Sequence, residues 1–163
     1  MRKRVPGVVL RTTMIVGHPG EGKRDFNELL DFVRDARFER LGAFRYSEEE
    51  GTYGAENFKD SISARVKQER LDELMTLQGE ISLAFNQSRV GSLEKVIVDD
   101  FTDGVFVCRS EFESPEVDGE ILVRPDNDFL GDIDPYSLIG EFMTVRVTGA
   151  DEYDLIAEPV ELL

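Results

Sequence analysis

The sequence is poor in the residue types that most often carry chemistry of their own. It has one cysteine, Cys108, one histidine, His18, and no tryptophan. A single thiol excludes both an intramolecular disulfide and a metal site with several thiolate ligands within this chain. No apolar run approaches the roughly 18 residues of a transmembrane helix. The basic start, residues 1–4, is not followed by the apolar stretch of a signal peptide. We therefore expect a cytoplasmic protein without a membrane segment.

Basic residues are scarce in one half of the chain only. The 163 residues include 34 acidic and 19 basic side chains, for a formal net charge of −15. Residues 1–89 hold 15 of each sign, whereas residues 90–163 hold 19 acidic residues and only four basic ones. A length of this order suits one domain or two small ones. The charge split predicts two domains with different partners, residues 1–89 and residues 90–163.

The first half shows the pattern of a strand, a helix and a second strand. Residues 8–16 are mostly apolar and β-branched, which is typical of a buried parallel strand. Residues 23–37 repeat apolar side chains at helical spacing, and residues 41–46 suit a second strand. Short connections between these segments predict a βαβ unit. A loop over residues 47–60 and a long helix to about Ser88 complete this half.

The second half has the texture of a small all-β domain. Short segments with apolar residues at every second position alternate with turn-rich stretches, as in Phe106/Cys108 and Ile121/Val123. About five such strands in about 70 residues predict a small antiparallel barrel of the OB type. The fold class predicted for the whole chain is therefore α+β.

One stretch has the glycine and lysine spacing of a nucleotide-binding loop. Residues 17–24 read GHPGEGKR, between a predicted strand and a predicted helix. Arg24 stands where the hydroxyl that binds magnesium should be, and Pro19 lacks an N–H that would donate to phosphate. Glu21 adds a carboxylate where phosphate oxygens would gather. These departures argue against a nucleotide phosphate site.

The same stretch resembles a segment of the radical S-adenosylmethionine methylthiotransferases. Residues 15–21 read IVGHPGE, similar to IVGFPGE at the fifth barrel strand of that family. Further similar segments follow the family's order: RTT at 11–13, FRYS at 44–47, VKQER at 66–70, LQGEIS at 77–82 and SPEVDG at 114–119. The resemblance covers nearly all of the chain. It implies a partial radical-SAM (βα) barrel segment, βαβ plus a long helix, followed by a TRAM β-barrel.

The loop after the second predicted strand distinguishes branches of this family. The tRNA-modifying members carry Tyr-Ser-x-Arg-x-Gly-Thr, whereas residues 46–52 here read YSEEEGT. This form is similar to the ribosomal-protein aspartate branch. The resemblance then implies methylthio transfer to the β-carbon of an aspartate in a basic protein of the small ribosomal subunit.

The acidity of residues 90–163 favours the same branch, because an acidic domain repels RNA and attracts a basic protein. The acidity also has a plainer interpretation as an aid to solubility. A tRNA methylthiotransferase and a non-catalytic acidic protein-binding module remain the alternatives.

The family implies cofactors that this chain cannot hold alone. Its members use S-adenosylmethionine and two 4Fe-4S clusters, one of them bound by a Cys-x-x-x-Cys-x-x-Cys motif. Cys108 by itself supplies neither cluster. We therefore expect part of a longer enzyme, monomeric, with no catalytic residue and no metal ligand of its own, and inactive alone.

The resemblance assigns cofactor contacts to the predicted strand pair. Thr13, Ile15 and Gly17 match a Gly-x-Ile-x-Gly pattern whose apolar side chain packs on adenine, although Thr13 replaces the first glycine. Phe44 and Tyr46 share one strand face and face either the barrel mouth or the next helix. Arg11 is a candidate partner for a carboxylate of the cofactor or of the substrate aspartate. A structural ion pair is its alternative role.

A second candidate site lies in the acidic half, around residues 109–119. Carboxylates there could meet lysines of a basic protein, with an aromatic side chain as an apolar anchor. A solvated acidic loop is the alternative. The candidate substrate-binding residues are Arg109, Phe112, Glu113, Glu116 and Asp118.

Overall fold

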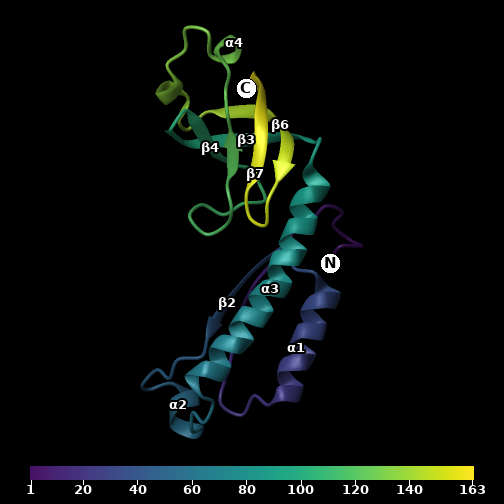
Figure 1. Ribbon diagram of the computed structural model, residues 1–163, viewed down its shortest axis with the longest axis vertical. Helices are drawn as coiled ribbons and strands as arrows, with labels where there is room; N and C mark the ends of the chain where they lie inside the picture. Colours follow the sequence, from purple (N-terminus) through teal and green to yellow (C-terminus); the bar gives the residue numbers. More distant parts are fainter. The chain divides into compact units, whose positions relative to one another are not determined.

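The computed structural model describes residues 1–163, apart from the side chain of Asn127. The chain divides into two compact units, Met1–Ile81 and Ser82–Leu163, and helix α3 (Ala64–Arg89) contributes residues to both (Figure 1). Each unit has its own hydrophobic core. The domain boundary expected between residues 89 and 90 lies at the end of α3 and remains a prediction.

The first unit is built on a pair of parallel strands. Strand β1 (Arg11–Val16) pairs with β2 (Arg40–Arg45), and helix α1 (Lys23–Ala36) connects them. This is the strand–helix–strand arrangement that the sequence predicts. Helices α1 and α3 bury one face of the pair in a common core. That core consists of Val16, Phe26, Leu30, Val33, Leu41, Leu74 and Ile81.

Local side chains define where α1 begins and ends. Its first turn is stabilised by Asp25, whose carboxylate accepts the Gly22 N–H at 2.7 Å. At the other end Arg37 takes a left-handed conformation, φ 47°, and its N–H bonds to the Val33 carbonyl. The helix therefore ends at Ala36, one residue before the predicted position. Strand β2 begins at Arg40, three residues after Arg37.

The stretch predicted as a loop after β2 contains a short helix, α2 (Tyr53–Asn57). Thr52 is its N-cap, and the Thr52 hydroxyl accepts the Ala55 N–H at 3.3 Å. Five residues that include Gly54 are too few to show a helical period in the sequence, so the pattern gave no sign of this helix.

The second unit contains a closed five-stranded barrel (Figure 1). Its strands follow the spatial order β3-β4-β5-β7-β6. The predicted α+β class with a five-stranded barrel is confirmed. One seam differs from the expected antiparallel pattern, because β5 and β7 run parallel. The strands are β3 (Leu93–Thr102), β4 (Val105–Arg109), β5 (Ile121–Val123), β6 (Phe142–Ala150) and β7 (Leu155–Leu162).

Alternating side chains fill the barrel interior. Phe106 and Cys108 of β4 point inward together with Ile121 and Val123 of β5, as their period of two predicts. Between β5 and β6 the chain forms helix α4 (Asn127–Leu130) and the 3-10 turn η1 (Pro135–Leu138), and Leu138 adds to the core. Within the described part of the chain, no helix combines the length and the apolarity that crossing a membrane requires.

Candidate functional site

The loop after β1 is held by a carboxylate of its own. Glu21 accepts the Gly17 N–H at 2.9 Å with one oxygen and an Arg70 Nη1–H at 2.7 Å with the other. Both side chains of this ion pair are nearly buried. Gly17 has φ +77°, and a Cβ there would come within 2.5 Å of Lys67 Cγ. The backbone donor that a phosphate could have used is thus already bonded to Glu21.

One face of the β1–β2 pair is left uncovered by the helices. Ile15 and Phe44 are register partners on this face and remain 57% and 62% exposed. Thr13 lies opposite Gly42, also exposed, and Arg11 stands at the exposed start of β1. The structure therefore brings Arg11, Thr13, Ile15 and Phe44 together on one surface.

Tyr46 follows β2 and lies at the carboxyl end of the strand pair. Its ring contacts His18 edge-on at 5.0 Å, and His18 in turn contacts Phe58 at 5.9 Å. The Tyr46 hydroxyl is buried and has no hydrogen-bond partner among the described residues. A buried hydroxyl without a partner is unusual and is a natural attachment point for a polar group of a ligand.

Lys67 fixes the backbone beside Tyr46. Its ammonium group donates to the Asp60 carboxylate at 2.5 Å and to the Tyr46 carbonyl at 3.1 Å, and it lies 5.0 Å from the Tyr46 ring centre. The hydrogen bond from Lys67 lowers the pKa of Asp60 below its ordinary value. Asp60, Lys67 and Tyr46 thus form one connected group behind the strand ends.

The iron–sulfur clusters that the family implies do not fit the residues present. Cys108 is buried inside the barrel, where burial and then the nearby charge of Asp99 raise the pKa of the thiol to about 12. A thiol in that state is a poor ligand, since metals bind the thiolate. Over the residues whose side chains the structure describes, no three His, Cys, Asp or Glu side chains are grouped to hold a metal ion.

The residues present fit S-adenosylmethionine better than they fit an iron–sulfur cluster, but only in part. The exposed Ile15 and Phe44 pair offers an apolar surface for a flat ring system, and the Tyr46 hydroxyl offers an unused polar group. Gly17 is buried and engaged with Glu21 through its N–H.

A buried charge cluster organises one end of the barrel domain. Arg89, only 6% exposed, binds Glu94 through Nε at 2.9 Å and through Nη2 at 2.5 Å. Its Nη1 donates to Glu113 at 2.5 Å, and Nη2 donates to the Ser110 hydroxyl at 3.1 Å. Burial alone would lower the pKa of Arg89, but its hydrogen bonds to the Glu94 and Glu113 carboxylates raise it, so the guanidinium keeps its charge.

Two aromatic rings complete this cluster. Phe85 of α3 and Phe112 lie 5.4 and 5.2 Å from the Arg89 guanidinium, and they meet each other edge-on at 6.2 Å. Phe112, expected as an anchor for a partner protein, is thus half-buried against Arg89.

The β4–β5 loop, residues 110–120, carries most of the predicted substrate-binding residues. Glu113 is buried, and its second oxygen accepts the Ser110 N–H at 3.0 Å and the Ser110 hydroxyl at 2.6 Å. Burial alone would raise the pKa of Glu113, but Arg89 and Ser110 outweigh it, so this pKa lies below its ordinary value. Glu113 therefore holds the loop together from inside, where a partner protein does not reach it.

The other predicted residues of this region lie nearer the surface. Glu116 is exposed and takes a left-handed conformation, φ 61°. The Asp118 carboxylate accepts the Ser114 N–H at 2.7 Å and closes a turn around Glu116. Arg109, at the end of β4, pairs with Asp99 at 2.9 Å.

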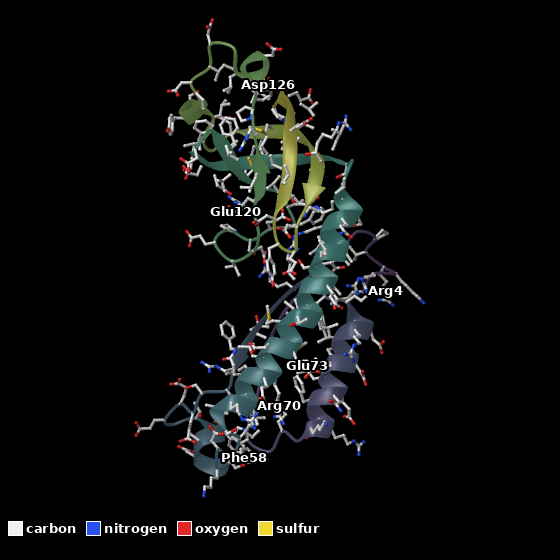
Figure 2. All side chains as sticks on the ribbon, in the orientation of Figure 1. Arg4, Phe58, Arg70, Glu73, Glu120 and Asp126 are labelled. Atoms are coloured by element: carbon white, nitrogen blue, oxygen red, sulfur yellow. The ribbon has the colours of Figure 1, made fainter. Side chains whose placement is uncertain are left out.

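A hollow of about 540 Å³ lies between this loop and strands β3 and β4. Glu120, labelled in Figure 2 just before β5, stands at its edge. The hollow brings together Arg109, Glu116 and Asp118 from the predicted set. Its charged lining consists of Asp99, Asp100, Arg109, Glu116, Asp118 and Glu120.

The sequence reasoning missed the roles of three cationic side chains that are buried or nearly buried, Lys67, Arg70 and Arg89. Lys67 and Arg70 were recognised only as letters of the VKQER segment, although their spacing of three places both on one face of α3. Figure 2 labels Arg70 on that helix. The contact between Arg89 and Glu113 had no sequence signal, because Glu113 lies 24 residues away in another element.

The comparisons with known proteins bear on both halves. Residues 90–160 match the TRAM domain family model, so the barrel is a TRAM domain. Over nearly its whole length the chain is also similar to bacterial proteins named "Ribosomal protein uS12 methylthiotransferase RimO". The relative from Phocaeicola vulgatus is 51% identical over 156 residues, which is 96% of this chain and 34% of the relative.

Two further relatives carry the same name. The relative from Bacteroides fragilis is 52% identical, and the match covers 96% of this chain and 35% of the relative. The relative from Porphyromonas gingivalis is 50% identical, and the match covers 99% of this chain and 36% of the relative. The chain is thus similar, over nearly its whole length, to methylthiotransferases named RimO, and it spans about a third of the length of these relatives.

Proposed function

We propose that the chain forms part of an enzyme that methylthiolates the β-carbon of an aspartate in the ribosomal protein uS12. In this proposal the acidic TRAM domain recognises the basic protein substrate. The observation that supports it best is about 50% identity, over 95% or more of the chain, to relatives named for this activity. A ribosomal substrate also implies that the enzyme works in the cytoplasm.

The charge of the TRAM domain supports a basic partner. Residues 90–163 hold the whole negative excess of the chain, with 19 acidic and four basic side chains. Within them, the hollow beside the β4–β5 loop gathers five carboxylates. Lysine and arginine side chains of a partner would be drawn to this surface, whereas the phosphates of tRNA would be repelled.

The uncovered face of the β1–β2 pair supports a role for the first unit in holding S-adenosylmethionine. Ile15 and Phe44 would pack on the adenine, and the Tyr46 hydroxyl would bond a polar atom of the cofactor. When bound, S-adenosylmethionine would supply the radical chemistry, and the residues of this chain would orient it. Arg11 and Thr13 would border the same surface.

Iron and sulfide reconstitution tests the inactivity proposed for the chain alone. Because its one thiol is buried and protonated, this chain should develop no cluster absorbance and no methylthiotransferase activity. A stoichiometric cluster would overturn this part of the proposal.

Binding to purified uS12 tests the recognition proposed for the TRAM domain. The full chain should bind uS12 with an affinity that falls as sodium chloride rises, because exposed charges are screened by salt. It should show no comparable affinity for tRNA. Tight tRNA binding would overturn the proposal and favour a tRNA methylthiotransferase.

Charge-reversed variants locate the contact. The double variant Glu116→Lys/Glu120→Lys should weaken uS12 binding by about tenfold or more at low salt. The control Asp132→Lys/Glu152→Lys makes the same change in net charge at exposed positions outside the hollow. An equal loss in both variants would show a general effect of net charge and would contradict recognition at this hollow.

A further inference from the structure

Arg89 is buried, yet it contacts the loop that the proposed function places in contact with a partner protein. Its side chain is buried at the end of α3, and four of its hydrogen bonds go to carboxylates or a hydroxyl of the same domain. Glu94 holds Arg89 to β3, whereas Ser110 and Glu113 belong to the β4–β5 loop. One guanidinium thus ties the loop to the barrel wall.

The order of the loop depends on this tie through a short chain of contacts. Glu113 needs a cation, because a buried carboxylate without one is strongly destabilised. The same carboxylate accepts the N–H and the hydroxyl of Ser110, and the Ser110 hydroxyl accepts the Phe112 N–H at 3.2 Å. Residues 110–113 are therefore folded around a charge that Arg89 neutralises.

The next residues along the chain form the exposed part of the loop. Ser114 begins the turn that Asp118 closes, and Glu116 stands in that turn. The far end of the loop is held separately, by the Glu120 N–H that donates to Asp154 at 2.9 Å. Only the near end, next to Glu113, relies on Arg89.

We infer that Arg89 is a positioning residue that holds the β4–β5 loop in the conformation that recognises the basic substrate. The second part of this inference, recognition of the substrate, rests on the proposed function. The first part, the order of the loop, does not. In this inference Arg89 keeps Glu116 and the hollow beside it in place for the partner, and does not itself touch the partner. Lysine at this position would meet one carboxylate and not both, because a single ammonium group cannot bridge them as the guanidinium does.

Amide hydrogen exchange of the full chain tests the positioning in the absence of any partner. In Arg89→Met, which keeps an unbranched side chain but no charge, exchange of residues 110–118 should rise about tenfold or more, while β6 and β7 keep their protection. Arg89→Lys should restore part of the protection. Unchanged exchange in the loop of Arg89→Met would overturn the inference.

Should Arg89→Met fail to fold, Glu113→Gln removes the loop side of the same pair with little change in shape. It should also raise exchange in residues 110–118, and unchanged exchange there would again overturn the inference.

Affinity for uS12 tests the second part. Arg89→Met should weaken binding by about threefold to thirtyfold, and Arg89→Lys should recover part of the loss. The control Val123→Ala creates a cavity in the barrel core beside Phe106, where β5 ends and β4 begins, so it should lower stability without lowering affinity.

An equal loss of affinity in Val123→Ala would show that Arg89 matters only for stability and would overturn the positioning role. If the unmodified chain does not bind uS12, the proposed function fails, and hydrogen exchange still decides whether Arg89 orders the loop.

Discussion

Glu21 supplies the loop after β1 with an internal anion. Its two oxygens bind the Gly17 N–H and the Arg70 guanidinium, both in nearly buried positions. A loop with the glycine spacing of a phosphate site is thereby closed by a side chain of the protein. The same carboxylate joins the end of β1 to α3, so it contributes to the stability of the first unit.

Replacing this carboxylate should destabilise the first unit measurably. Glu21→Ala leaves the Gly17 N–H without its partner and the nearly buried Arg70 guanidinium with the carbonyl of residue 21 but no carboxylate, which costs about 1–3 kcal/mol. Urea unfolding followed by helical circular dichroism measures the change. The control Glu28→Ala breaks an exposed pair with Arg24 on α1 and should cost less than about 0.5 kcal/mol. Equal losses in the two variants would contradict a special role for Glu21.

Glu113 should make the stability of the TRAM domain depend on pH. Its pKa in the folded state lies below the ordinary value of 4.5, so it contributes stability above that pH. The contribution is lost as pH falls through the lowered pKa. Between about pH 5 and about pH 3 the unfolding free energy should therefore fall more in the parent chain than in Glu113→Gln.

The neighbour Glu111 provides the matched control for this pH dependence. Glu111 is exposed in the same loop, so Glu111→Gln should keep the parent pH profile. The comparison uses the midpoints of urea unfolding at each pH, measured from NMR resonances of the barrel strands. Identical profiles for Glu113→Gln and the parent chain would show that the buried pair does not contribute.

Strands and helices with a clear period were the part of the fold accessible from sequence. The alternation in β4 and β5 and the helical spacing in α1 predicted both the elements and their buried faces. The parallel pairing of β5 with β7 was not predictable, because it depends on where a distant segment returns and not on either strand's own pattern. The contacts of Arg89 escaped for the same reason, since Glu113 lies in another element.

The candidate site was accessible only through resemblance. The sequence grouped Ile15 with Phe44, and the structure makes them register partners on an uncovered face. It also grouped Glu113 with Glu116, but burial separates their roles, because one is paired inside and the other is exposed. Sequence spacing cannot distinguish a loop carboxylate that points inward from one that points outward.

The packing of the β4–β5 loop against the β6–β7 turn depends on Gly119. A Cβ at this position would overlap the carbonyl of Tyr153. Gly119→Ala should therefore destabilise the TRAM domain by about 2–4 kcal/mol, because backbone must move. Gly149→Ala, where a Cβ meets only the Ile156 side chain at 3.4 Å, should change stability by less than about 1 kcal/mol. Urea unfolding compares the two, and similar losses would contradict this explanation.

The two units differ in how completely their sheets are paired. The barrel has no free edge strand, whereas β1 and β2 form a two-stranded parallel sheet with one face uncovered. Parallel sheets are normally covered on both faces. We expect amides of β1 and β2 to exchange with solvent about tenfold faster or more than those of the barrel strands, as measured by hydrogen exchange of the full chain. Equal protection in the two units would contradict this prediction.

The parallel seam between β5 and β7 has a consequence for how the barrel folds. Hairpin-like neighbours such as β3–β4 and β6–β7 close short loops, whereas the seam joins Ile121 to Leu155 through only three paired residues. Closing this longer loop for only three residue pairs is entropically less favourable than closing either hairpin. The seam should therefore form after the local hairpins, and substitutions within β5 should mainly accelerate unfolding and leave the folding rate nearly unchanged.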